Sequence, residues 1–256
     1  MDTHTPPAQN RPLIGLCGRT DPTGEYLLYF RDYALRVFEA GGLPVGLPYH
    51  EMAAGCAPEI AERFDGILFT GGADIDAASF GGKAYDDRTH HALGQTMPLR
   101  DEFEGALLEA CWDKDVPCLG VCRGVQVMNV ARGGTLARDV TEQLWSHGAT
   151  LDVHLQPKPF EAPVHQVYIE PNSRLAKILG TLEASVNSLH HLAISTVPEG
   201  AHVTARADDG TPEALEFPDR TFFLGVQWHP EMMGTQPQLF EALVAAANDR
   251  RIAKGR

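Results

Sequence analysis

The stretch VPCLGVCRGVQVMNVA, residues 116–131, decides the fold class of this 256-residue chain. Residues 116–121 are an apolar run of the kind that forms a buried strand, and residues 123–131 follow a helical pattern that ends at two glycines. Between the two lies Cys122, in the turn Gly-Val-Cys-Arg-Gly. A buried strand that turns directly into a helix is typical of a mostly parallel sheet covered by helices.

The same alternation continues on both sides of this stretch. It predicts strands at 13–18, 64–70, 164–170, 184–187, 202–207, 213–217 and 221–227, and helices at 25–40, 98–113 and 236–248. The turn Asp208-Asp209-Gly210 predicts a hairpin in the second half. The length would also allow two small domains, but no repeat, low-complexity tract or compositional change marks a linker. We therefore predict one α/β domain over residues 11–250, after a flexible polar tail over residues 1–10.

The composition excludes several classes of protein. Apolar residues make up 43% and charged residues 21%, which is typical of a globular domain. The formal net charge of −13 argues against nucleic acid or an anionic membrane as a main partner, because both require an excess of Lys and Arg. No export signal and no apolar run of about 20 residues is present, and the five cysteines form no Cys-x-x-Cys pair. These features predict a cytoplasmic protein.

Cys122 is a candidate nucleophile because of the residues around it. Glycines two positions before and two positions after it allow the close backbone approach that a sharp strand-to-helix turn requires. The turn also places the sulfur at the N-terminus of a helix, where the helix dipole favours the thiolate. The backbone N–H of Arg123 can then face a developing oxyanion. The other four cysteines lack this context and are expected to be small buried side chains.

His229 is the candidate base among eleven histidines, because it follows the apolar strand predicted at 221–227. Pro230 keeps His229 out of the helical conformation, so the chain is expected to stay extended there. Residues two apart in an extended segment point to the same side, which lets Glu231 hold one imidazole nitrogen while the other faces Cys122. A surface His–Glu pair is the alternative, and the buried strand before it argues against that.

Gly71-Gly72 follows the strand predicted at 64–70. Loops at the carboxyl ends of parallel strands share one edge of the sheet, so this loop should lie beside the cysteine turn. The N–H of Gly72 could complete an oxyanion hole with that of Arg123. Alternatively, the two glycines only allow a turn at the end of the strand. The motif alone does not decide between an oxyanion hole and a simple turn. The loop is too short for a phosphate loop and lacks its Lys-Ser/Thr ending.

Two further groups of polar residues are candidate substrate-binding residues. Gln126 is one helical turn beyond the nucleophile and could reach a pocket there, although a surface or helix-contact glutamine has the same spacing. The second group follows a predicted strand and comprises Asn187, Ser188, His190 and His191. It could form the rim of a substrate pocket or a capped loop.

The sequence predicts no metal site. The adjacent pairs His90-His91 and His190-His191 would point to opposite faces of a strand. No constellation of Asp, Glu or His at ligand spacing accompanies them in the sequence, so we expect chemistry carried by side chains alone.

Four motifs, GVCRGVQ, GGADI, NSLHH and GVQWHPE, together resemble the class I glutamine amidotransferase-like hydrolases over residues 11–250. The resemblance implies a three-layer α/β/α fold of the flavodoxin-like, class I glutamine amidotransferase type. It also implies that Cys122, His229 and Glu231 form a catalytic triad that needs no cofactor. Among these hydrolases, those acting on γ-glutamyl-γ-aminobutyrate are most similar. The implied reaction is therefore hydrolysis of a γ-glutamyl amide through a γ-glutamyl thioester, in putrescine degradation.

Two departures from this family lie where substrate could be held. Relatives usually have proline and tyrosine where this chain has Ala77 and Phe80, and they tend to have glutamine where it has Leu192. Neither departure touches the triad, so the identity of the γ-glutamyl substrate stays open.

The leading hypothesis is a stand-alone hydrolase that acts on a small-molecule γ-glutamyl substrate. One alternative is a glutaminase subunit that passes ammonia to a separate synthetase. Another is a catalytically inactive binding protein, against which the intact triad argues. The sequence allows a homo-oligomer but does not determine the oligomeric state.

Overall fold

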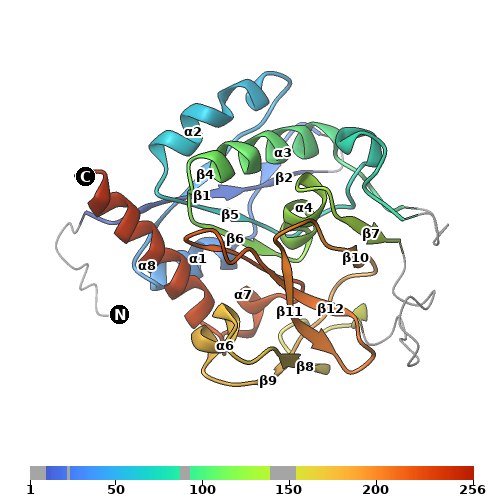
Figure 1. Ribbon diagram of the computed structural model, residues 1–256. Coiled ribbons are helices and arrows are strands. Elements are labelled where there is room, and N and C mark those ends of the chain that lie inside the picture. The colour runs from blue at the N-terminus through green and yellow to red at the C-terminus, as the bar shows by residue number, and fades with distance from the viewer. Residues whose placement is uncertain (1–9, 22–23, 87–92, 139–153) are drawn as a thin grey trace.

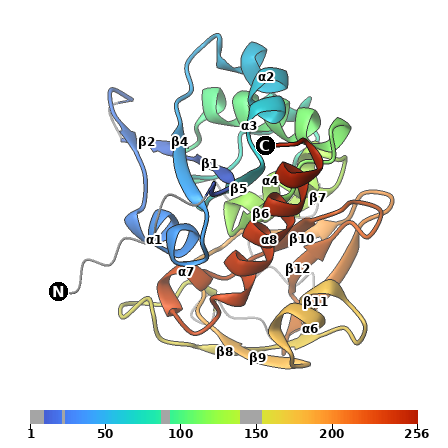
Figure 2. The same cartoon turned by 90° about the vertical axis from the view of Figure 1, so that its left-hand side faces the viewer.

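The structure is a computed structural model that describes residues 10–21, 24–86, 93–138 and 154–256. Within these ranges it has a nine-stranded sheet in the order β4-β1-β5-β6-β13-β12-β11-β8-β9. Helices cover both faces of this sheet, as Figures 1 and 2 show. The predicted three-layer α/β/α fold is therefore confirmed. All but the last residue of the predicted tail, and the pair His90-His91, lie outside the described residues.

The parallel part of the sheet carries the turn around Cys122. Its strands are β4 (Leu43–Leu47), β1 (Leu13–Cys17), β5 (Gly66–Phe69), β6 (Cys118–Val121) and β13 (Phe223–Val226). Every residue of β5, β6 and β13 is buried, because helices cover both faces of the sheet there. This burial explains why their sequences are continuous apolar runs rather than alternating ones.

The rest of the sheet is an antiparallel extension. Its strands are β12 (Pro212–Glu216), β11 (His202–Ala207), β8 (His165–Ile169) and β9 (Glu183–Val186). The hairpin predicted at residues 208–210 joins β11 to β12. There the N–H of Gly210 donates to the carbonyl of Ala207 at 2.9 Å, and the N–H of Ala207 donates to the carbonyl of Thr211 at 2.9 Å. The predicted hairpin turn is therefore confirmed.

Each face of the sheet has its own hydrophobic core. On one face lie α2 (Ala57–Arg63), α3 (Pro98–Asp113) and α4 (Arg123–Ala131), and on the other α1 (Arg31–Glu39), α6 (Arg174–Leu179) and α8 (Gln238–Ala253). Alternate strand residues supply the two cores, so that Ile67 and Phe69 face α3 while Leu68 faces α8. Among the described helices, none has the length and apolar character needed to cross a membrane.

Several elements differ from the sequence prediction. The helix predicted at 25–40 begins only at Arg31, because β3 (Leu27–Leu28) first pairs with β2 (Arg19–Thr20). Strand β4 was not predicted, since Pro44 and Gly46 disfavour a strand, and the sheet tolerates them because β4 is at its edge. Other unpredicted elements are short: α2, α6, β7 (Thr135–Ala137), β10 (Ala193–Thr196), and the 3-10 turns at Ala53–Cys56 and Ala77–Phe80.

Helix α4 lies unusually close to the sheet. A Cβ atom added to Gly124 would be 2.1 Å from the carbonyl oxygen of Phe69 in β5. A Cβ atom on Gly120 would be 2.7 Å from the carbonyl carbon of Gly124. Both obstacles are backbone atoms, which cannot rotate away as a side chain can. The two glycines that flank Cys122 are therefore required by packing as well as by the turn.

We expect Gly124→Ala to lower the free energy of unfolding by at least about 2 kcal/mol, because its methyl group would overlap the backbone of β5. Urea denaturation monitored by circular dichroism measures this loss. Gly55→Ala is the matched control, since its Cβ atom would meet no atom within 4 Å, and it should change stability by less than about 1 kcal/mol. Equal stability of the two variants would contradict the close packing of α4.

Candidate active site

Cys122 lies in the turn between β6 and α4. Its backbone is left-handed, with φ of 52° and ψ of −110°, a conformation that costs about 1–3 kcal/mol for residues other than glycine. Two backbone hydrogen bonds hold it there. The N–H of Cys122 donates to the carbonyl of Val226 at 2.8 Å, and the N–H of Val125 donates to the carbonyl of Cys122 at 3.1 Å. The strained turn predicted for this cysteine is therefore present.

The imidazole of His229 interacts with both Cys122 and Glu231. Its Nδ1 atom is 2.7 Å from Oε1 of Glu231, and the other side of the ring faces the cysteine thiol. Burial lowers the pKa of His229, but Glu231 and Cys122 outweigh burial and raise that pKa well above its ordinary value. A protonated imidazole beside the cysteine is the arrangement that stabilises a thiolate.

The predicted contact between His229 and Glu231 is present, but the backbone that brings the two side chains together is helical rather than extended. The chain does not stay extended, because Pro230–Met233 forms the short helix α7. Pro230 is the first residue of that helix, where its missing N–H breaks no hydrogen bond. The restriction that a proline places on the preceding residue does hold, since His229 has φ of −113° and ψ of 78°.

Asn187 and Ser188 have a role different from the predicted one. Both side chains are fully buried, and neither lines a described cavity of the site. The amide oxygen of Asn187 accepts from the N–H of His229 at 2.9 Å, and its amide nitrogen donates to the carbonyl of His229 at 3.1 Å. The hydroxyl of Ser188 donates to the carbonyl of His154 at 2.8 Å. The side chain of Asn187 thus holds the backbone of His229, and that of Ser188 holds the backbone of His154.

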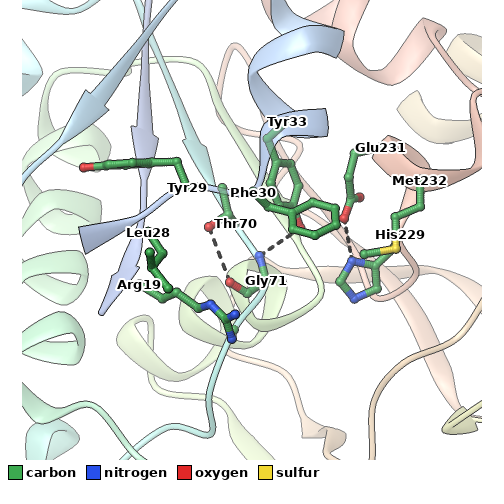
Figure 3. A pocket seen from close by; sticks show the side chains of 11 residues that line it. Arg19, Leu28, Tyr29, Phe30, Tyr33, Thr70, Gly71, His229, Glu231 and Met232 are labelled. Carbon is green, nitrogen blue, oxygen red and sulfur yellow. Dashed lines mark hydrogen bonds and ion pairs between the residues drawn. The ribbon is translucent and has the colours of Figure 1, made fainter. Parts of the chain in front are cut away.

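Two cavities meet near Cys122 and His229. The larger, of about 410 Å³, is lined by His229, Glu231 and side chains that include Tyr29 and Phe30, as Figure 3 shows, and also by Gly72. The smaller, of about 80 Å³, is lined by Cys122 together with Asp74, Gln126 and Leu192. Gly72 lines both, so Cys122 and His229 open onto adjoining spaces.

The other predicted substrate residues do line the smaller cavity. Gln126 is buried there and donates to the carbonyl of Leu192 at 3.3 Å, while Nε2 of His191 lies 3.1 Å from the carboxylate of Asp74. His190 also borders this cavity. Of the two departures from the family pattern, Leu192 lies at the cavity, whereas Phe80 packs against α3.

One premise of the prediction that the chain has no metal site is wrong, because a cluster of His and Glu side chains does accompany His190. Nε2 of His190 is 3.4 Å from Oε1 of Glu213, and His154 and His165 lie beside the same carboxylate. The sequence could not show this cluster, because its four members are far apart along the chain.

Two backbone N–H groups are available for an oxyanion. The N–H of Gly71 is not one of them, because it donates to the hydroxyl of Tyr33 at 3.0 Å (Figure 3). Within the described part of the chain, the N–H groups of Gly72 and Arg123 donate to no other group. Both residues line the smaller cavity with Cys122. This arrangement favours the predicted pair, and Tyr33 is a positioning residue that the sequence analysis missed.

The side chain of Arg123 points away from the cavity into a buried network of charges. Its guanidinium group forms ion pairs with Asp101 and Glu104 of α3, and all three side chains are at most 1% exposed. The predicted contribution of Arg123 to the site is therefore confined to its backbone. Its side chain instead attaches the first turn of α4 to α3.

Arg100 extends this network to the glycine loop. It pairs with Glu104 at 2.6 Å and donates to the carbonyl oxygens of Thr70 at 3.0 Å and Gly71 at 3.2 Å. The network thus holds the loop that carries Gly72 in a fixed position relative to α4. The sequence analysis missed it, since charged residues in the first turns of a helix usually face water, and only the packing of α3 shows that these are buried.

Comparison with known proteins agrees with this geometry. Residues 12–231 match the family described as peptidase C26. This chain belongs to that family. A glutamine amidotransferase-like protein of Rickettsia prowazekii is 33% identical in an alignment that covers 85% of this chain and 88% of that protein. The γ-glutamyl-γ-aminobutyrate hydrolase PuuD of Escherichia coli K12 is 31% identical in an alignment that covers 96% of this chain and 98% of that protein.

A solved structure supports the fold independently of the sequence. The glutaminase domain of the CTP synthase of Trypanosoma brucei, solved with acivicin bound, superposes with a TM-score of 0.58 and 18% identity, covering 93% of this chain and 94% of that one. Together with the motifs, these matches confirm the resemblance to the class I glutamine amidotransferase-like hydrolases. The peptidase C26 member described here is a hydrolase of that type.

We expect Glu231→Gln to move the alkaline limb of the pH profile of kcat/KM to lower pH. The carboxylate raises the pKa of His229, so removing its charge lowers that pKa, and the protonated imidazole is lost at a lower pH than in the parent. The value of kcat/KM at the optimum should fall roughly tenfold to a thousandfold. Glu241→Gln, an exposed change on α8, is the control. An unmoved alkaline limb in Glu231→Gln would show that this carboxylate does not act through His229.

We expect Glu104→Ala to lower the free energy of unfolding by about 3–5 kcal/mol, because Arg100 and Arg123 would lose a buried counter-charge. Glu109→Ala on the same helix is the matched control. The pair between Glu109 and Arg132 is partly exposed, so its loss should change stability by less than about 1 kcal/mol. Urea denaturation of both variants measures the difference, and equal values would mean that the network contributes little to stability.

Proposed function

We propose that this chain hydrolyses a γ-glutamyl amide through a thioester on Cys122. The observation that carries the proposal is the position of this cysteine, at a strained turn, beside His229 and at the junction of two cavities. The peptidase C26 match and the named activity of the E. coli relative support it. We place the reaction in the cytosol, where a reducing environment keeps a catalytic thiol free.

The proposed reaction has two steps. In the first, the Cys122 thiolate attacks the γ-carbonyl carbon, and the oxyanion that forms accepts hydrogen bonds from the N–H groups of Gly72 and Arg123. The protonated His229 then transfers its proton to the leaving amine, and the thioester remains. In the second step, His229 removes a proton from water, which attacks the thioester and releases glutamate and the cysteine. Glu231 holds the imidazole in place throughout.

The two cavities suggest which half of the substrate occupies each space. The glutamyl half stays on sulfur and therefore belongs in the smaller cavity beside Cys122, where Asp74, Gln126 and His191 offer polar groups. The amine half receives a proton from His229 and belongs in the larger cavity. Arg19 lines that larger cavity next to apolar side chains such as Leu28. A carboxylate on a short aliphatic amine would suit this lining, which favours γ-glutamyl-γ-aminobutyrate over glutamine, whose leaving group is ammonia, and with it a place in putrescine degradation.

The proposal is tested by incubating the protein with γ-glutamyl-γ-aminobutyrate, other γ-glutamyl amides and glutamine, and measuring the glutamate released. We expect the first substrate to have the highest kcat/KM. Cys122→Ala should lower turnover by more than about a thousandfold, because no other group supplies the nucleophile. Cys56→Ala is the matched control, since Cys56 is an exposed free cysteine and the change should leave turnover intact.

Each alternative gives a different result in the same assay. A glutaminase subunit would prefer glutamine and would be stimulated by a partner synthetase. An inactive binding protein would release no glutamate from any member of the panel, and a γ-glutamyl-directed electrophile would not label Cys122. Equal turnover by Cys122→Ala and the parent would overturn the mechanism.

A further inference from the structure

Three histidines and a glutamate form a buried cluster behind the smaller cavity. Glu213 belongs to β12 and His165 to β8. His190 lies in the loop of residues 187–192, and His154 precedes β8 in the chain. None of the four residues is more than 9% exposed. The proposed reaction uses none of their side chains, so the cluster needs an explanation of its own.

The four side chains converge on one carboxylate oxygen. Oε1 of Glu213 is 3.5 Å from Nδ1 of His154, 3.7 Å from Nε2 of His165 and 3.4 Å from Nε2 of His190. These three nitrogens and both carboxylate oxygens are buried, and none has a hydrogen-bond partner. Unpartnered buried polar atoms are rare, and here five of them belong to one cluster of four side chains.

Each histidine ring has an inner nitrogen, which faces Glu213, and an outer nitrogen, which faces away from it. The hydrogen bonds of the outer nitrogens explain why the inner ones have no partner. Nε2 of His154 is 2.7 Å from a carboxylate oxygen of Asp209. Nδ1 of His165 is 3.2 Å from the carbonyl of Gln166, and Nδ1 of His190 is 2.9 Å from the carbonyl of Leu192. Each of these partners can only accept, so in a neutral ring the outer nitrogen carries the proton. The inner nitrogens then present lone pairs, and they face a carboxylate that also presents lone pairs.

We propose that His154, His165, His190 and Glu213 bind one divalent transition-metal ion, with Zn²⁺ as the best match. Three imidazole nitrogens and one carboxylate oxygen are ligands that Zn²⁺ accepts. In a tetrahedral site with bonds of about 2.0–2.1 Å, neighbouring ligand atoms are roughly 3.3–3.4 Å apart. Here Oε1 of Glu213 is 3.4–3.7 Å from the three ring nitrogens, and the ligand atoms of His154, His165 and Glu213 all lie within 4.8 Å of one another, so the side chains would close around the ion. Histidines that bind a metal usually donate their other ring N–H to a carboxylate or a backbone carbonyl. The three rings here have such acceptors at their outer nitrogens.

Four protein ligands leave no open position, so the site is of the structural kind. The metal would join β8 and β12 to the loop of residues 187–192. That loop supplies Asn187, which holds the backbone of His229, and the Leu192 carbonyl, which accepts from Gln126. The ion would therefore support the base and the small cavity without taking part in the reaction.

A proton is the competing way to satisfy the cluster. Burial lowers the pKa of His154, but the nearby carboxylates of Asp209 and Glu213 outweigh burial and raise that pKa to about 9, so a buried imidazolium could pair with Glu213. Such a cluster would bind no metal. Metal content and spectroscopy therefore separate the two explanations, and neither measurement depends on enzymatic activity.

The experiment uses the full chain with Cys122→Ala as the background, because Cys122 and His229 could otherwise bind metal themselves. The protein is loaded with Zn²⁺ or Co²⁺, dialysed, and its metal content is measured by inductively coupled plasma mass spectrometry. We expect about one ion per chain, and visible d–d absorption typical of tetrahedral Co²⁺. Removing the metal with a chelator should lower the melting temperature by on the order of 5 °C, and adding Zn²⁺ should restore it.

Variants connect the metal to these side chains. Glu213→Gln and His165→Gln in the same background should lose the bound ion and the effect of the chelator on melting temperature. His202→Gln is the matched control, since His202 is exposed on β11 between the two strands that supply ligands. Less than a tenth of an ion per chain after loading, with no d–d bands, would overturn the proposal. Unchanged metal content in both Glu213→Gln and His165→Gln would overturn it equally.

Discussion

The structure depends on the contact between the backbone of α4 and the backbone of β5. No side chain fits between Gly124 and the carbonyl of Phe69, so the first turn of the helix rests directly on the sheet. This contact sets the direction in which α4 leaves β6, and it forces Cys122 into a left-handed conformation. The strain is tolerated because strands on both sides and a helix on top define the turn. The sulfur is thereby placed at the carboxyl edge of the sheet, where the other loops meet.

Buried polar groups position these loops around the sulfur. The network of Arg100, Glu104 and Arg123 holds the glycine loop against α4, and Asn187 holds the backbone of His229 from the opposite side. In each case a side chain satisfies a main-chain group that burial would otherwise leave unpaired. The arrangement gives the site a rigid frame in which Cys122 and His229 line adjoining cavities.

Much of this could be read from the sequence, because the decisive features are local. The flanking glycines of Cys122 indicate the tight turn, the apolar runs indicate the buried strands, and the pattern around His229 indicates a histidine at a strand end beside Glu231. Each of these features depends on residues within one element, so neighbouring positions suffice to show it. At Pro230 the expected extended backbone was wrong, because residues 230–233 form a helix. The predicted contact between His229 and Glu231 is nevertheless present.

The sequence alone determined the strand-to-helix turn, the candidate nucleophile, the candidate base and the α/β class. Each of these follows from the spacing of a few neighbouring residues, which has a direct steric or chemical meaning. The tertiary structure decided what depends on long-range packing. It buried Arg100 and Glu104, turned Asn187 from a substrate residue into a support for His229, and assembled His154, His165 and His190 around Glu213. Such contacts join residues tens of positions apart, and only the folding of the sheet and its loops brings those residues together.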